Sequence, residues 1–233
     1  MKVEKLSNSP NFGLRAQTHE FITYNLARNY AHLNSETADM FAKFVQKPDF
    51  DETGLKILGK ATCNNHFYYP PQTYRRRESH LDFDGKHNAF SKYNEHICRM
   101  FTCLSKHNKK GAIEEAARAK HFLDDMSVGL HVKRGTVLDK YKEERVHKEF
   151  EAFIEDNQDK FYDNRSKSDL KKYLPSDNNN FDDLFVATVK TSLENEIPNE
   201  ANSDRWSEIA QKTINLNIDS SREFFKLFLS LFV

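Results

Sequence analysis

Residues 121–131 read HFLDDMSVGLH, and residues 147–151 read HKEFE. Each stretch holds a histidine followed four residues later by a carboxylate: His121 and Asp125 in the first, His147 and Glu151 in the second. Residues i and i+4 lie on one face of an α-helix, so each pair can offer two ligands to one metal ion. Two antiparallel helices of this kind would direct two imidazoles and two carboxylates into one gap.

A further histidine, His131, ends the first stretch. We expect residues 130–136 to be a loop that can turn this imidazole toward the same gap. Imidazole nitrogens with carboxylate oxygens, and no thiolate, are a ligand mix typical of zinc. On this pattern alone, a metal site and a set of ordinary surface pairs are equal alternatives.

The sequence around these stretches is helical in character. Apolar residues recur at helical spacing over 14–32, 35–47, 89–106, 111–129 and 137–160. A capping-box pattern, Ser220 to Glu223, predicts the start of a last helix, which we expect to be a core helix because it is apolar all round. We find no internal repeat and no alternation typical of strands. The chain is therefore predicted to be all-α.

Composition excludes several classes of protein. The 233 residues carry 35 basic and 35 acidic side chains, so no net charge is available for non-specific binding of nucleic acid. Three cysteines, Cys63, Cys98 and Cys103, form no C-x-x-C, and we expect buried free thiols. No apolar run is long enough for a transmembrane helix, and the N-terminus lacks a signal-peptide pattern. We expect a protein that is cytoplasmic or exported by a signal-independent route.

Taken together, the motifs resemble the zinc-dependent phospholipase C and S1/P1 nuclease superfamily. HFLDDMSVGLH and HKEFE are similar to its metal core, H-x3-D-x5-H followed by H-x3-E or H-x3-D. Upstream, HFYYP at 66–70 resembles the family's HFYDP, and THEFITYNLA at 18–27 resembles its first helix. These matches occur in the family's order across residues 14–155.

The resemblance implies a single multi-helix domain with a multinuclear zinc site between helices. Residues 1–13 would be a leader, 14–160 the zinc-binding helical core, and 161–233 C-terminal helices that complete the same domain. One zinc ion would be held by four residues and a second by three: Asp51, His66, His121 and Asp125 for the first; His131, His147 and Glu151 for the second.

A third zinc site of the family uses the first histidine, here His19, the bridging Asp125 and an N-terminal Trp. The only Trp of this chain is Trp206, so we expect two tightly bound zinc ions and a third site that is weak, empty or completed from elsewhere. Asp51 is the candidate catalytic residue, as a ligand or as a general base acting through a bound water. Glu114 and Asp124 could orient ligand imidazoles, but we expect both on the solvated helix surface. Asp124 also competes with Asp125 as ligand.

The resemblance implies a phosphodiester hydrolase. HKEFE and HFYYP favour the phospholipase C branch, which cleaves glycerophospholipids to diacylglycerol and a phosphorylated head group. A phospholipid substrate and transient membrane-surface contact are then expected, and nucleic acid is not favoured. Choline preference is not supported, because Glu52 and Cys63 stand where choline-specific members carry aromatic residues.

Two other hypotheses remain at this point. One is a single-strand nuclease or nucleotidase built on the same metal core. The other is a binding or regulatory protein with an impaired site, suggested by the missing N-terminal Trp and by the VGL turn before His131, where the family often has a proline.

Overall fold

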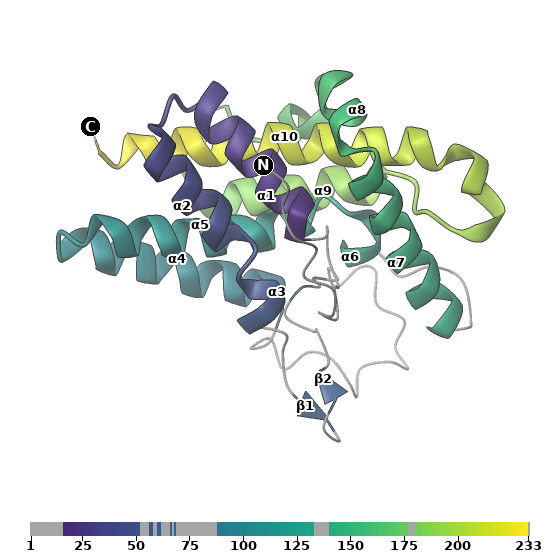
Figure 1. Cartoon of the computed structure of the whole chain (residues 1–233), viewed down its shortest axis with the longest axis horizontal. Helices are drawn as coiled ribbons and strands as arrows, with labels where there is room; N and C mark the ends of the chain where they lie inside the picture. Colours follow the sequence, from purple (N-terminus) through teal and green to yellow (C-terminus); the bar gives the residue numbers. More distant parts are fainter. Residues whose placement is uncertain are drawn as a thin grey trace.

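The structure, a computed structural model, describes residues 16–51, 56–57, 60–61, 66, 68, 88–132, 140–176 and 180–232. Most of them are helical, and the predicted all-α class is confirmed (Figure 1). The strands described are two antiparallel two-residue segments. In chain order the elements are α1 (Ala16–Asn29), α2 (Ser35–Val45), α3 (Pro48–Asp51), β1 (Lys56–Ile57), β2 (Lys60–Ala61), α4 (Ala89–Ser105), α5 (Lys109–Asp125), α6 (Gly129–Val132), α7 (Lys140–Asp156), α8 (Gln158–Asp163), η3 (Asp169–Lys172), α9 (Phe181–Glu194), η4 (Glu200–Arg205) and α10 (Trp206–Ser230).

Helices α4 and α5 form a hairpin that carries the first metal motif. The turn between them contains His107 at φ 56° and ends at Asn108, whose side chain accepts a hydrogen bond from the backbone N–H of Gly111 at 3.0 Å. A Cβ on Gly111 would lie 2.5 Å from Asn108 Nδ2, so this cap needs glycine. Helix α2 packs against α5 as well as against α1.

The predicted start of the last helix at Ser220 is wrong. Helix α10 begins at Trp206 and runs through this position without a break, because its buried apolar residues keep helical spacing. The serine hydroxyls form bonds that do not end a helix. Ser220 Oγ donates to the Asn217 carbonyl at 3.1 Å, and Ser221 Oγ donates to Asp124 Oδ1 at 3.3 Å.

The apolar end of α10 belongs to the core, as expected. Phe225 and Phe228 both pack edge-on against Phe41 of α2, with ring centroids 5.2 Å apart in each case. Beyond this contact Leu231 and Phe232 are exposed. In Figure 1, α10 crosses the length of the molecule, and it contacts α1, α5, α7, α8 and α9. The C-terminal helices thus pack on the helices that carry the metal motifs.

Two further expectations are corrected. The stretch 130–136 is not all loop, because Gly129–Val132 form the short helix α6, which includes His131, and the preceding helix ends at Asp125 and not at Gly129. Cys98 is exposed and Cys103 half-buried, whereas we expected both to be buried, and Cys63 lies outside the described residues. Among the helices described, none is both long and apolar enough to cross a membrane.

Candidate metal centre

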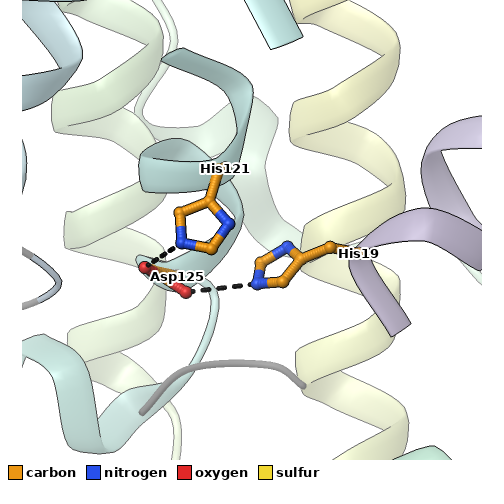
Figure 2. Close-up of side chains that lie close together, drawn as sticks. All are labelled: His19, His121 and Asp125. Carbon is orange, nitrogen blue, oxygen red and sulfur yellow. Dashed lines mark ion pairs between the residues drawn. The ribbon is translucent and has the colours of Figure 1, made fainter. Parts of the chain in front are cut away.

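Asp125, at the end of α5, lies at the centre of a group of buried imidazoles. Its Oδ2 is 2.8 Å from His66 Nδ1 and 3.3 Å from His121 Nε2. Its Oδ1 is 3.4 Å from Nε2 of His19, which α1 supplies from the opposite side (Figure 2). All four side chains are almost completely buried. The carboxylate therefore faces imidazoles through both of its oxygens, as a bridging metal ligand does.

A second carboxylate, Asp49 of α3, completes this group. Its Oδ1 is 3.7 Å from His121 Nε2, which in turn is 3.1 Å from His66 Nδ1. We expected Asp51 in this place, and its side chain lies outside the described residues, so that prediction stays untested. Asp49 was not predicted, because the resemblance implies a single aspartate ahead of His66 and Asp51 was assigned to that position. The PDFD stretch, with two aspartates two residues apart, is the signal that could have included it.

The second predicted group is also brought together. His147 and Glu151, on one face of α7, place Nε2 and Oε1 2.7 Å apart. His131 of α6 completes the group, with its Nε2 2.9 Å from His147 Nε2 and 3.5 Å from Glu151 Oε1. The three side chains are buried.

A backbone hydrogen bond joins the two groups. His131 Nδ1–H donates to the carbonyl of His66 at 2.8 Å, and the backbone N–H of Tyr68 donates to the His131 carbonyl at 2.9 Å. With its proton on Nδ1, a neutral His131 presents the Nε2 lone pair to His147 and Glu151. The imidazole is thereby oriented as a ligand by a carbonyl of the other group.

Several of these buried atoms have no hydrogen-bond partner among the described residues. They are His19 Nε2, His121 Nδ1, Asp49 Oδ2, Asp125 Oδ1 and both carboxylate oxygens of Glu151. Buried polar atoms are normally hydrogen-bonded, since an unpaired one costs about 1–3 kcal/mol. Nitrogen and oxygen atoms that lie close together in a buried group, some of them without a hydrogen-bond partner in the described part of the chain, are arranged as ligands of a cation. The donor set, nitrogen and oxygen without sulfur, fits zinc.

The electrostatics of the metal-free protein agree with this interpretation. Burial lowers the pKa of His19, but the adjacent carboxylates of Asp124 and Asp125 outweigh burial and raise the pKa to about 10. Burial raises the pKa of Asp125, yet the surrounding histidines hold it well below its ordinary value. Burial raises the pKa of Glu151 to about 7. Without a metal ion, protons would have to supply the positive charge between these groups.

Asp124 is fully buried, so the expectation of a solvated residue is wrong. Its Oδ2 is 3.2 Å from His19 Nδ1, and both of its oxygens accept hydrogen bonds from Lys120 Nζ, at 2.9 and 2.7 Å. Lys120 and Asp124 repeat, one position earlier, the i,i+4 spacing of His121 and Asp125. Glu114 does not orient an imidazole and is partly exposed, 3.5 Å from Arg118.

Comparison with known proteins gives a match only at the level of structure. No protein-family model matches the chain, and no curated sequence is recognisably similar to it. The alpha-toxin from Clostridium absonum has a similar fold, with a TM-score of 0.67 and 16% sequence identity over 96% of this chain. An alpha-toxin of Clostridium perfringens, from avian strain SWCP, gives a TM-score of 0.63 and 15% identity over the same share.

The chain covers 65% of the length of each of these toxins. At such low identity the likeness concerns the fold. It agrees with the resemblance that the histidine and carboxylate motifs gave independently. The chain thus has an all-α fold similar to that of the part of the clostridial alpha-toxins that it covers.

Proposed function

We propose that this protein is a zinc-dependent phosphodiester hydrolase of the phospholipase C type. The observation that supports the proposal most strongly is the convergence of buried imidazoles and carboxylates in three groups, in each of which the possible ligand atoms lie within 4.8 Å of one another. When bound, zinc ions would lower the pKa of a water molecule and polarise a phosphoryl oxygen. The reaction would be the attack of water on a phosphodiester.

The residues of this chain would divide the work by position. Asp49, His66, His121 and Asp125 would hold one ion, and His131, His147 and Glu151 a second. His19 and the free oxygen of Asp125 would hold a third, with the second oxygen of Asp125 turned toward the first. Asp51 remains the predicted catalytic residue, as a ligand or as a general base acting through a bound water. The burial of these groups keeps bulk water from competing for the ligands, which strengthens every charge interaction in the site.

A phospholipid is the substrate class that we favour. In addition to HKEFE, the support is Phe50, which follows Asp49 in α3 and is 47% exposed beside the buried group. In choline-specific members of the family that these motifs resemble, an aromatic residue next to the loop aspartate contacts the quaternary ammonium. If Asp49 is the loop aspartate, the residue next to it is Phe50 and not Glu52. Of the two residues that spoke against choline preference, Glu52 and Cys63, only Cys63 then remains.

Metal analysis followed by a substrate panel tests the proposal. The purified full chain should contain two or more zinc ions and should release phosphorylated head groups from phosphatidylcholine or phosphatidylglycerol vesicles. Phe50→Ala should reduce turnover of the choline lipid more than that of the glycerol lipid. Hydrolysis of single-stranded DNA in place of lipid would identify the nuclease alternative. Less than one zinc ion per chain, with no hydrolysis, would overturn the proposal.

A further inference from the structure

Two adjacent aspartates end α5, and the structure gives them different surroundings. Asp125 faces His19, His66 and His121, and its Oδ1 has no hydrogen-bond partner among the described residues. Asp124 has partners at both oxygens. Oδ1 accepts from Lys120 Nζ at 2.9 Å and from Ser221 Oγ at 3.3 Å, and Oδ2 accepts from Lys120 Nζ at 2.7 Å and lies 3.2 Å from His19 Nδ1. Because both oxygens of Asp124 already have these partners, Asp125 is the aspartate that can bind a metal ion.

The His19 ring lies between these two carboxylates. Nδ1 points to Asp124, whereas Nε2 points to Asp125 at 3.4 Å and has no hydrogen-bond partner within the part of the chain that the structure describes. An imidazole that donates Nδ1–H to a carboxylate has its Nε2 lone pair free. Carboxylates that fix the tautomer and orientation of a metal-ligating histidine in this way typically strengthen metal binding by about 10–100-fold.

Lys120 gives Asp124 a second kind of support. Its Nζ is fully buried, together with the carboxylate that it contacts, and the pair carries no net charge. Asp124 can therefore remain ionised without adding negative charge to the site. The backbone at Asp124 is also fixed, since its carbonyl accepts from Ser127 Oγ at 2.6 Å.

We propose that Asp124, held by Lys120, is a positioning residue that presents Nε2 of His19 to a metal ion bound at Asp125. The proposal rests on the function proposed above, because it concerns the same site. It also gives the third metal position a support that comes from α5 and α10 and needs no Trp near the N-terminus. The ion at this position should then be held more tightly than its two protein ligands, His19 and Asp125, would hold it alone.

Zinc titration of the metal-stripped full chain tests this, with Co²⁺ as a second probe whose visible absorption reports on ligand geometry. The variant is Lys120→Met with Asp124→Leu, which removes the pair together and leaves no unpaired buried charge. We expect one class of zinc site to weaken by about 10–100-fold and the cobalt spectrum to change. The melting temperature of the metal-free protein should be unchanged or higher.

Two further variants make the result specific. Lys120→Met with Asp124→Asn keeps an oxygen acceptor for His19 Nδ1 and should restore most of the lost affinity. In a His19→Gln background, the Met and Leu pair should cause no additional loss of metal binding, because it acts through His19. As a control, Lys212→Gln with Glu208→Gln removes an exposed pair that is also four residues apart, with Nζ–Oε1 at 2.8 Å, and should leave zinc binding unchanged.

The outcomes separate this inference from the proposed function. Wild-type protein that binds zinc, together with a Met and Leu variant that binds it equally tightly, overturns the positioning role and leaves the hydrolase proposal standing. An affinity loss that persists in the His19→Gln background also overturns it, because the pair would then act on the fold. Wild-type protein that binds no zinc overturns both.

Discussion

At the scale of single residues, the most informative question about the site is which aspartate of α3, Asp49 or Asp51, is a metal ligand. Asp49 is buried, and its Oδ1 lies 3.7 Å from His121 Nε2. Burial raises the pKa of the Asp49 carboxyl group. We therefore expect Asp49→Asn to weaken zinc binding at the first group by at least about tenfold, measured by competition with a chromophoric chelator.

Asp51→Asn is the matched control on the same short helix. If it keeps full zinc content but loses hydrolysis, Asp51 has the role of general base that the sequence predicted. If Asp51→Asn loses zinc and Asp49→Asn does not, the ligand is Asp51 and our assignment of Asp49 is wrong.

The histidines that begin the two i,i+4 pairs should be essential. His121→Ala and His147→Ala each remove a buried imidazole from a group of three or four donors. Each variant should lose at least one zinc ion per chain, abolish hydrolysis and lower the melting temperature, because metal binding is coupled to folding. His32→Asn, at an exposed position with φ 52°, is the control and should match the wild-type protein. Wild-type turnover in either alanine variant would contradict the site.

At the scale of elements, periodicity predicted helices and failed at their ends. The spacing of apolar residues located α1, α2, α4, α5 and α7 to within a few residues. It could not show that α10 continues through Ser220 and Ser221, because a capping box has the same letters whether or not its serines bond within a helix. Nor could it show α6, since four residues contain too little periodicity to identify a helix.

The start of α5 gives a prediction at this scale. Asn108 caps the helix that carries His121 and Asp125, and its side chain accepts from Gly111 N–H. Asn108→Ala should lower the free energy of unfolding of the metal-free protein by about 1 kcal/mol, measured by urea denaturation. Gly111→Ala should have a similar or larger effect, because its Cβ would displace the Asn108 side chain. Asn108→Ser, which keeps a capping oxygen, should have little effect, and an equal loss in that variant would contradict a capping role.

At the scale of the whole molecule, the sequence predicted which candidate side chains come together better than it predicted their surroundings. His19, His66 and Asp125 come from α1, from a residue before α4 and from α5, and spacing within one motif cannot show how such segments meet. The resemblance supplied their order along the chain. It supplied neither the bond from His131 to the His66 carbonyl nor the contact of Asp124 with His19, because both depend on how distant segments pack.

The whole molecule should also respond to pH in a way that depends on zinc. In the metal-free fold the pKa of Glu151 is raised to about 7 and that of His19 to about 10, so both side chains bind protons more tightly than in the unfolded chain. Stability contributed by a group with a raised pKa is present below its unfolded pKa and is lost as pH rises through the folded one. For Glu151 this loss begins above about pH 4.5, and for His19 it begins above about pH 6.5.

Zinc should reverse this loss, because it binds the deprotonated donors and releases their protons. Zinc affinity should therefore increase with pH, and the melting temperature of the zinc-bound protein should exceed that of the metal-free protein by a margin that widens between about pH 5.5 and 8. Calorimetric titrations in two buffers of different ionisation enthalpy would count the protons released, and His19→Gln should release fewer than the wild-type protein at pH 8. A margin that stays constant over this range, with no proton release, would mean that these buried groups do not bind the ion.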